Sequence, residues 1–367
     1  MESIALYFYS LANAGGAERM VCQIARALLE RGYSVYIVSW DNSTASSYYP
    51  LHSSIKWLKL GFHPTRLDKI RRTRKLMLAL KQNDIRLLIG FVMSADKTVY
   101  TAAKLANVSL VVAERNAPSM YWLKYNWLHR WVVFLLLHLS SRITVQFSNF
   151  IKDYPKTLHK RMVVIHNPVI STSLNALPHL PNINGRYTVL AVTRLDKVQK
   201  RINILVKAFA KISKRNLEWD LLIIGDGPEK TSLQNLINEY GISERVKIQS
   251  STPDIFSVYS KVHLFAIPSL WEGFPNALAE ALSHGVPAIG FRDADGVAQL
   301  IDDNTTGWLV DGFGSEELFS ETLDIAMNSP DERAHRGKLA SENMRVYSSE
   351  EQYARWSSLV QSVLDDK

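Results

Sequence analysis

Two glutamates, Glu272 and Glu280, flank the predicted junction of a loop and a helix. The apolar run ending at Ile267 predicts a strand, and Pro275 fits the first turn of a following helix, where its missing N–H costs nothing. A helix N-terminus attracts phosphate, and carboxylates accept hydrogen bonds from sugar or ribose hydroxyls. The segment 268–282 therefore predicts a site for a phosphorylated sugar. The plain alternative is one capping acid and one surface acid.

A basic loop follows the strand predicted over 188–192 and contains Arg194 and Lys200. Ligands of open α/β sheets bind at the carboxyl ends of the strands, so this loop would present two cations to a ligand. Arginine makes forked contacts with phosphate and lysine acts as a point charge, a pair that suits a diphosphate. Lys197 is an alternative second cation, and a solvated basic loop remains the plain interpretation.

A glycine pair, Gly15 and Gly16, lies between the first predicted strand and the first predicted helix. Adjacent glycines let backbone approach a ligand closely. The segment matches neither the dinucleotide fingerprint nor a Walker loop, because the required glycine and lysine spacings are missing. A ligand contact and a plain tight turn both fit these two residues.

The elements that position these loops repeat the order strand, loop, helix. Apolar residues recur at helical spacing between 21 and 29, and Gly32 is a plausible helix stop. Uninterrupted apolar runs suit parallel strands covered on both faces. Strands after the first two are predicted at 87–92, 110–113, 143–147, 162–165, 188–192, 221–224, 246–248, 264–267 and 288–290.

We predict an α/β chain of two Rossmann-like, doubly wound parallel-sheet domains that face a cleft. The periodicity lapses over 168–186 into Pro, Asn and Gly, which indicates a linker. The predicted parts are an N-terminal domain over 1–170, a linker over 171–186, a C-terminal domain over 187–345 and a closing helix over 346–367.

Composition narrows the class of protein. The chain has 367 residues, of which 47% are hydrophobic and 21% charged, as expected for two folded domains rather than a disordered or fibrous chain. The single cysteine, Cys22, excludes an intramolecular disulfide and a cysteine zinc cluster, and it falls on a core-facing helix position. The first residues enter a strand pattern without a signal-peptide pattern, so we expect a cytoplasmic protein.

Charge is divided unevenly along the chain. Residues 1–170 contain 23 Lys and Arg against 9 Asp and Glu, whereas the remainder is acidic. A basic first half indicates an anionic partner, either a phospholipid surface or nucleic acid. The run 66–75 is a candidate contact or simply a solvated helix. The tryptophan-rich segment 121–139 predicts a packed helix or one lying at a membrane interface.

Glu272 and Glu280, with seven residues between them, resemble the E-x7-E signature of the family-4 retaining glycosyltransferases of GT-B fold. The resemblance extends to other segments in the same order: Gly-Gly-Ala-Glu at 15–18, Glu114-Arg115-Asn116, Arg194-Leu195, Gln199-Lys200, Ile224 to Pro228 and Thr306 to Val310. Departures from the family pattern are Thr193 and Arg201, where glycine is usual, and Gln299, where glutamate is often found. The resemblance implies that the closing helix crosses back to the first domain.

The resemblance assigns roles by position: the N-terminal domain over 1–170 would bind the acceptor, and the C-terminal domain over 187–345 the nucleotide-sugar donor. Catalytic roles fall on Glu272, Arg194, Lys200 and Asn116, and donor contacts on Gly15, Gly16, Gly273, Phe274, Pro275, Asn276 and Glu280. Arg194 and Lys200 would bind the donor diphosphate, and Glu280 the ribose. Because two cations take the place of a metal, we expect no metal and no cofactor. Asp293-Ala294-Asp295 is interpreted as a loop.

The resemblance implies retaining transfer of a sugar from a nucleoside-diphosphate donor to a glycan or polyprenyl-diphosphate-linked acceptor. The bacterial process would be the assembly of capsule, lipopolysaccharide or another surface polysaccharide, at the inner face of the cytoplasmic membrane. A nucleotide-sugar epimerase of the same architecture is the alternative enzyme. A nucleic-acid-binding protein is disfavoured, because no signature of such a protein accompanies the basic half.

Overall fold

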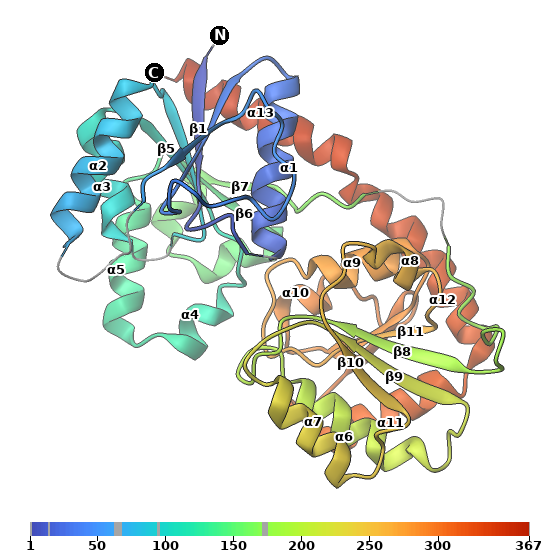
Figure 1. Ribbon diagram of the computed structural model, residues 1–367. Helices are drawn as coiled ribbons and strands as arrows, with labels where there is room; N and C mark the ends of the chain where they lie inside the picture. The colour runs from blue at the N-terminus through green and yellow to red at the C-terminus, as the bar shows by residue number, and fades with distance from the viewer. Residues whose placement is uncertain (1, 14, 62–67, 94–95, 171–174, 367) are drawn as a thin grey trace. The chain divides into compact units, whose positions relative to one another are not determined.

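The computed structural model describes residues 2–13, 15–61, 68–93, 96–170 and 175–366 (Figure 1). The chain forms two compact units. Unit 1 contains Met1–Pro168 and Glu350–Lys367, and unit 2 contains Val169–Ser349. Each unit is built on one parallel sheet, so the predicted pair of doubly wound α/β domains is confirmed.

Unit 1 has a seven-stranded sheet in the order β3-β2-β1-β4-β5-β6-β7, with every pairing parallel. Its strands are β1 Ser3–Tyr7, β2 Ser34–Ser39, β3 Lys56–Lys59, β4 Leu87–Phe91, β5 Ser109–Ala113, β6 Arg142–Val145 and β7 Met162–Val164. The described helices are α1 Gly16–Glu30, α2 Lys69–Gln82, α3 Lys97–Ala106, α4 Ser119–Lys124, α5 Trp127–Leu137, η2 Ser148–Asp153, η3 Lys156–Arg161 and α13 Ser349–Asp365.

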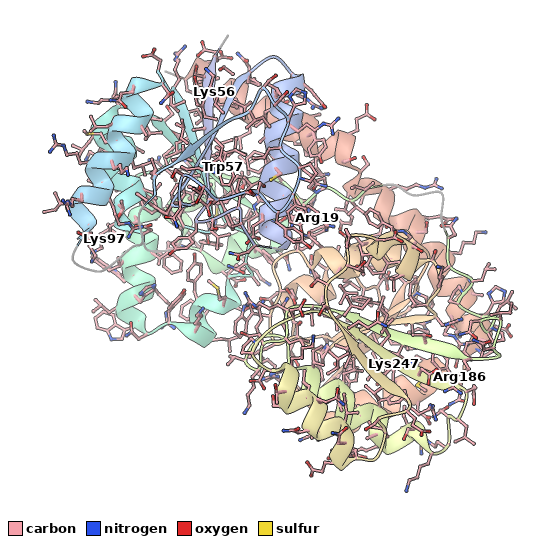
Figure 2. All side chains as sticks on the ribbon, in the orientation of Figure 1. Arg19, Lys56, Trp57, Lys97, Arg186 and Lys247 are labelled. Atoms are coloured by element: carbon pink, nitrogen blue, oxygen red, sulfur yellow. The ribbon has the colours of Figure 1, made fainter. Side chains whose placement is uncertain are left out.

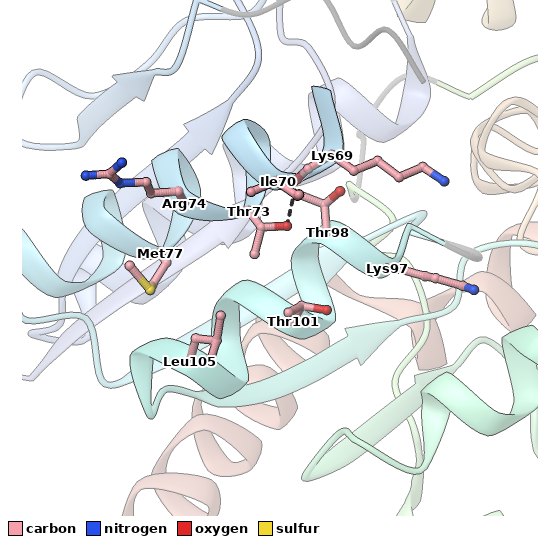
Figure 3. A pocket seen from close by; sticks show the side chains of 9 residues that line it. All are labelled: Lys69, Ile70, Thr73, Arg74, Met77, Lys97, Thr98, Thr101 and Leu105. Atoms are coloured by element: carbon pink, nitrogen blue, oxygen red, sulfur yellow. Dashed lines mark hydrogen bonds between the residues drawn. The ribbon is translucent and has the colours of Figure 1, made fainter. Parts of the chain in front are cut away.

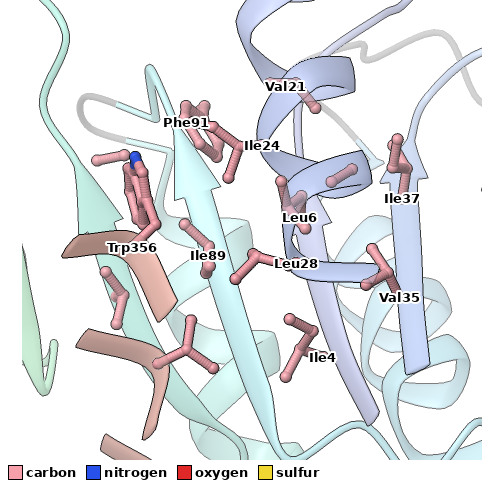
Figure 4. Packing of buried hydrophobic residues seen from close by; sticks show 14 of the residues in the cluster. Ile4, Leu6, Val21, Ile24, Leu28, Val35, Ile37, Ile89, Phe91 and Trp356 are labelled. Carbon is pink, nitrogen blue, oxygen red and sulfur yellow. The ribbon is translucent and has the colours of Figure 1, made fainter. Parts of the chain in front are cut away.

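The core of unit 1 lies between this sheet and two helices from opposite ends of the sequence (Figure 4). From α1, Ile24 and Leu28 pack onto the strands, and from α13, Trp356 does the same, its ring centroid 5.8 Å from that of Phe91. All four side chains are almost fully buried. Because α13 completes this core, the expected return of the closing helix to the first domain is confirmed.

Cys22 belongs to the same core, as the helical spacing predicted. Burial raises the pKa of its thiol to about 11, so it is protonated at neutral pH and unsuited to act as a nucleophile.

Unit 2 has a six-stranded parallel sheet in the order β10-β9-β8-β11-β12-β13. Its strands are β8 Tyr187–Val192, β9 Trp219–Ile224, β10 Val246–Gln249, β11 Leu264–Ile267, β12 Ala288–Phe291 and β13 Gly307–Val310. The described helices are α6 Ile202–Ser213, α7 Lys230–Glu239, α8 Ile255–Tyr259, α9 Asn276–Ser283, α10 Asp295–Ala298, α11 Glu316–Met327, α12 Pro330–Asn343 and η4 Met344–Tyr347.

The edge strands β3 and β10 carry lysine. β3 reads Lys-Trp-Leu-Lys, and β10 contains Lys247 (Figure 2). Lysine on an edge strand discourages pairing with another chain. In β3 the lysines stand at both ends and leave no apolar run, so this strand was not predicted, whereas the edge strands β7 and β10 were.

The predicted linker over 171–186 differs from the structure in its described part. Residues 171–174 lie outside the described residues, and the rest is fixed to unit 2. The backbone N–H of Ala176 donates to the carbonyl of His284 (2.8 Å), and buried Arg333 donates to the carbonyl of Pro178 (2.8 Å). Prolines and asparagines spoil the periodicity, but their backbone groups are still held by hydrogen bonds.

None of the helices that the structure describes is long and apolar enough to cross a membrane.

Arg201, directly before α6, has the left-handed backbone angles φ 50° and ψ 37°. This conformation costs an ordinary residue about 1–2 kcal/mol and costs glycine almost nothing. Arg201 also lies over the ring of Phe313, 5.4 Å from its centroid, so removing the side chain has a cost of its own. We therefore expect Arg201→Gly to be about 1 kcal/mol more stable than Arg201→Ala, which loses the same contact but keeps the strain. Urea unfolding of the two variants measures this difference, and an alanine variant of equal or greater stability would contradict it.

Candidate active site

The candidate site of unit 2 lies where the strand order reverses. β8 is paired with β9 on one side and β11 on the other, so the loops that follow β8 and β11 leave neighbouring strands at the same sheet edge. Open α/β sheets bind ligands at such a switch point. The first loop spans 193–201 and contains the predicted cations. The second spans 268–275 and contains Glu272.

The first loop is folded around Asp196. Its carboxylate accepts hydrogen bonds from the backbone N–H groups of Val198 (3.1 Å) and Gln199 (2.8 Å), which turns the chain back towards the sheet. Gly225 lies so close beneath the loop that a β-carbon there would collide with the carbonyl oxygen of Thr193. The glycine of the segment 224–228 therefore serves close backbone packing.

The two loops are joined through Gln199. Its backbone carbonyl accepts from the N–H of Leu270 (2.8 Å), and its side-chain amide donates to the carbonyl of Trp271 (3.1 Å). Since backbone atoms of both loops take part, these hydrogen bonds fix the position of one loop relative to the other. The next residue, Lys200, is thereby directed at the second loop.

Lys200 and Glu272 form an ion pair, with Nζ 2.5 Å from Oε1. The hydroxyl of Ser269 donates to the same oxygen at 2.7 Å. The side chains are 18% and 8% exposed, so the charges are largely withdrawn from water, where their interaction is stronger than on an open surface. Two of the predicted site residues are thus brought into direct contact.

The other two cations of the first loop lie differently. Arg194 is 64% exposed and 3.9 Å from Asp196, and Lys197 is exposed. An exposed arginine at a strand end is available to a ligand without breaking a buried pair. Of the two candidate lysines, the geometry favours Lys200 as the one built into the site.

Glu280 lies on α9 and is 9% exposed. The phenol of Tyr259, at the end of α8, donates to its Oε2 at 3.1 Å. One turn later the backbone carbonyl of Glu280 contacts Nδ1 of His284 (2.7 Å), a buried ring stacked on Phe256. Burial lowers the pKa of His284, so the ring stays neutral at neutral pH and stabilises the helix end without charge.

The start of α9 differs from the prediction by one residue. The helix begins at Asn276, and Pro275 occupies the preceding cap position with extended backbone angles. The ring of Phe274 is buried against Tyr347, with centroids 5.3 Å apart, so this side chain holds the loop down. The N-terminus of α9 follows Gly273 by three residues along the chain.

The loop containing Glu272 is supported from below by the start of α10. The N–H of Gly296 donates to the carbonyl of Glu272 (3.0 Å), and a β-carbon at Gly296 would collide with the carbonyl oxygen of Gly273. Asp295 is the first residue of α10, so Asp293-Ala294-Asp295 runs from the end of β12 into this support. Within the described parts of the chain, no group of three or more His, Cys, Asp or Glu side chains could hold a metal ion.

Three predicted site residues lie in unit 1, each after a strand. Gly15 caps α1 and Gly16 begins it, with the side chain of Glu18 folded over Gly15. Asn116 follows β5 and is half-buried.

The two residues before Asn116, Glu114 and Arg115, hydrogen-bond to neighbouring elements of unit 1. Glu114 is buried and accepts hydrogen bonds from the hydroxyls of Tyr121 (2.5 Å) and Tyr154 (3.1 Å), and burial raises its pKa. Arg115 donates to Thr144 at 2.5 Å. The loop carrying Asn116 is therefore fixed to α4, to the chain after η2 and to β6.

Sequence analysis assigned no role to Ser269, Asp196 or Tyr259. Ser269 and Asp196 lie within the two loop motifs, whose analysis considered only Glu272, Arg194 and the lysines. Their place in these motifs could have indicated that they hydrogen-bond within the loops. Tyr259 lies 21 residues before Glu280 on another helix, and no local pattern connects the two.

The ion pair of Lys200 and Glu272 predicts a stability effect. Lys200→Ala leaves a carboxylate buried without its cation, which costs about 3 kcal/mol of unfolding free energy. In Lys200→Ala/Glu272→Gln the unpaired charge is gone, so we expect more than half of that loss to be recovered. Urea unfolding of the single and double variants measures both values. A double variant no more stable than Lys200→Ala would show that the charges are not coupled.

Family models match both halves of the chain. Residues 14–172 match the model described as Glycosyltransferase Family 4, and residues 178–343 match Glycosyl transferases group 1. The amylovoran biosynthesis glycosyltransferase AmsD of Erwinia amylovora is 27% identical over 98% of this chain and 100% of its own length. An N-acetylgalactosaminyltransferase of Campylobacter jejuni, named for a diphospho-undecaprenol-linked acceptor, is 24% identical over 92% of this chain and 94% of its own.

The fold is shared with solved structures. Anabaena HepE in complex with UDP-glucose superposes with a TM-score of 0.79, at 17% identity, over 99% of this chain and 100% of that one. The two parallel-sheet units are therefore those of the GT-B fold, as the motifs implied. Together with the matched family models, this places the chain among the GT-B glycosyltransferases of the family 4 type.

Proposed function

We propose that this glycosyltransferase moves a sugar from a nucleoside-diphosphate donor to a lipid-linked glycan, with retention of configuration and without a metal ion. The observation that carries the proposal is the buried pair of Lys200 and Glu272 at the switch point of unit 2, next to the N-terminus of α9. HepE, of the same fold, has been crystallised with UDP-glucose, and the Campylobacter relative is named for a diphospho-undecaprenol-linked acceptor.

Leaving-group stabilisation is the main demand of the reaction. Breaking the bond between sugar and phosphate places negative charge on the departing diphosphate, and fixed positive charge lowers the barrier. Arg194, Lys200 and the first N–H groups of α9 supply that charge. Two side-chain cations and a helix N-terminus do here what a divalent metal does in other transferases, so the mechanism needs no metal.

The two carboxylates would hold the donor's hydroxyl groups. Glu272 shares the Lys200 ammonium and receives the Ser269 hydrogen bond on Oε1, which orients the carboxylate while its other oxygen remains for a sugar hydroxyl. Glu280, fixed by Tyr259, would bind the ribose. Gly15 and Gly16 of unit 1 would contact the donor through backbone, and Asn116 would stand near the reacting sugar.

A front-face reaction accounts for retention without a covalent intermediate. The departing phosphate oxygen takes the proton of the acceptor hydroxyl, and that hydroxyl attacks the same face of the sugar from which the phosphate leaves. Proton, leaving group and nucleophile are thus balanced within one step. The protein's contribution is to hold the phosphate and sugar in place.

The acceptor would be presented at an anionic membrane surface on the cytoplasmic side, with unit 1 in contact with the lipid and with no role for nucleic acid. Supporting this is an exposed apolar face on α4 and α5, here called the aromatic surface: Trp122, Leu123, Trp127, Leu128, Trp131, Leu135 and Leu139, each at least 47% exposed. The guanidinium of Arg130 lies 4.1 Å from the ring centroid of Trp122.

The segment 121–139 was predicted to be a packed or an interfacial helix. In the structure Val133 and Leu137 of α5 are buried, whereas Trp127, Leu128, Trp131 and Leu135 are exposed. Tryptophan beside arginine is typical of the headgroup region of a bilayer. This distribution favours the interfacial alternative.

The donor site is tested by a thermal-shift panel of nucleotide sugars, followed by release of the nucleoside diphosphate from the best donor in the presence of membrane extract. We expect Glu272→Gln to lower kcat/KM by about 100-fold or more, as removal of a transition-state contact does. Ser269→Ala should lower kcat/KM about tenfold, the value of one hydrogen bond to a charged group.

Two further measurements test the proposed mechanism. EDTA should leave the rate unchanged, and the anomeric configuration of the product, determined by NMR, should equal that of the donor.

Three outcomes would contradict this assignment. Near-normal turnover by Glu272→Gln would remove the proposed sugar contact. Full loss of activity in Lys197→Ala with retention in Lys200→Ala would transfer the phosphate role to the exposed lysine. Conversion of the donor to its epimer without any acceptor would identify the alternative enzyme.

Membrane docking is tested by flotation of the full chain with liposomes. Each Trp that inserts contributes apolar area worth about 2 kcal/mol, so Trp127→Ser/Trp131→Ser should weaken binding to anionic liposomes at least tenfold. Leu217→Ser/Ile325→Ser, two exposed apolar residues of unit 2, provide the matched control and should bind as the unsubstituted chain does. Equal binding by both pairs, or no binding of the parent chain at physiological salt, would contradict docking through the aromatic surface.

A further inference from the structure

A groove of about 420 Å³ lies in unit 1 between α2 and α3 (Figure 3). Lys69, Ile70 and Met77 of α2 line it from one side, and Lys97 and Leu105 of α3 from the other. These residues do not take part in the donor site or in the aromatic surface. The groove is therefore a separate feature of this unit.

The groove has two lysines at one end and aliphatic side chains along its length, with Arg74 beside Met77 at the other end. Lys69 and Lys97 are the first residues of their helices, and Figure 3 shows both side chains extending from the same end of the groove. Met77 and Leu105 lie further along the helices, towards the opposite end. A ligand that matches the two lysines and the aliphatic lining has a charged group at one end and a hydrocarbon at the other.

Most of the described charges near the end with the two lysines are positive. Asp68, the N-cap residue of α2, is an acid beside Lys69 and has interactions of its own. α2 contains six Lys or Arg residues and no Asp or Glu, and α3 contains two Lys and no acid. Asp96, which caps α3, is engaged by Arg72 at 3.2 Å. No ion pair joins Lys69 or Lys97 to another described residue. Two like charges on adjacent helix ends repel each other, so an anion between them removes that repulsion.

The aliphatic lining of the groove is open to water. Ile70, next to Lys69, is 86% exposed, and Leu105, at the other end, is 56% exposed, although both line the groove. Covering exposed aliphatic side chains yields about 25 cal/mol for each Å² removed from water. A hydrocarbon chain lying along the groove would gain this energy, whereas an inorganic anion would not.

The position of the groove relates it to the transferred sugar. α2 and α3 follow β3 and β4, so Lys69 and Lys97 lie towards the carboxyl ends of the strands, the edge of the sheet that also carries Gly15 and Asn116. A phosphate held between the two lysines would place whatever is attached to it at that edge. Its hydrocarbon would run away from the edge along the groove.

We propose that this groove binds the isoprenoid diphosphate of the acceptor, with the diphosphate between Lys69 and Lys97 and the first isoprene units along Ile70, Met77 and Leu105. The inference rests on the proposed lipid-linked acceptor. A diphosphate matches two ammonium groups better than a membrane phospholipid does, because a phosphodiester carries a single negative charge. The groove would thus set the distance between the lipid anchor and the sugar that receives the transfer.

The experiment measures binding of farnesyl diphosphate to the full chain by isothermal titration calorimetry. Farnesol lacks the phosphates, inorganic diphosphate lacks the hydrocarbon, and dihexanoyl phosphatidylglycerol carries a phosphodiester. We expect farnesyl diphosphate to bind at least about tenfold more tightly than each of the three, since each lacks an interaction worth 1.4 kcal/mol or more. Inorganic diphosphate binding equally well would reduce the site to a simple anion contact, and equal binding of phosphatidylglycerol would make it a general lipid-docking site. Either result overturns the proposal.

Variants locate the binding to the groove. Lys69→Glu/Lys97→Glu should weaken binding of farnesyl diphosphate at least about tenfold, and Met77→Glu should weaken it while leaving inorganic diphosphate unaffected. The matched control is Lys75→Glu/Lys104→Glu, which makes the same charge change on the same helices outside the groove and should bind as the parent does. Equal loss in both double variants would show a nonspecific charge effect and overturn the proposal.

The result is separable from the donor chemistry. Each variant is first checked for its thermal shift with the best nucleotide sugar, which depends on unit 2 and reports a folded protein. A normal donor shift with no binding of farnesyl diphosphate overturns the groove proposal alone. Binding of farnesyl diphosphate by a chain that gives no donor shift would contradict the proposed transferase chemistry and leave the groove as a lipid-diphosphate site.

Discussion

The ion pair of Lys200 and Glu272 is the constraint on which the donor site depends. It joins the loop after β8 to the loop after β11, and these strands are neighbours only because the sheet order reverses between them. Buried charges are tolerated when each has a partner, and here each charge is the partner that the other needs. The same pair keeps a cation and a carboxylate close together where the proposed chemistry would use both.

In unit 1 a buried carboxylate is stabilised by hydroxyl groups rather than by a cation. Glu114 is buried, but its carboxylate is satisfied by two tyrosine hydroxyls that come from α4 and from the end of η2. These contacts fix α4, and α4 in turn carries part of the aromatic surface. An apolar surface held on a rigid frame loses little conformational entropy when it meets another apolar medium. The exposed Trp122 therefore lies on a helix that the buried hydrogen bonds of Glu114 hold in place.

Much of the fold and part of the site could be predicted from the sequence, for physical reasons that differ by residue. Interior strands such as β4 and β5 are apolar throughout because helices cover both faces, and this signal is local. β3 was missed because lysine at both of its ends leaves no apolar run, and the short edge strand β13 was also missed. The positions of Glu272 and Lys200 followed from motif order, but their contact did not, because 72 residues separate them. Tyr259 reaches Glu280 from another helix and left no pattern. Arg201 adopts a left-handed conformation that arginine disfavours, and the hint in the sequence was that glycine is usual in the family at this position.

The structure shows where part of the positive charge of the first half lies, which the composition could not indicate. The composition alone indicates only an anionic partner, and nucleic acid and membrane satisfy it equally. In the structure, α2 and α3 concentrate positive charge without any acid of their own, beside aliphatic side chains that face water. Nucleic acid offers phosphate but no hydrocarbon to cover Ile70 and Leu105, and a neutral bilayer offers hydrocarbon but no net charge for Lys69 and Lys97. The amphiphile proposed for this groove would match both features, which is why the charge and the aliphatic lining are considered together.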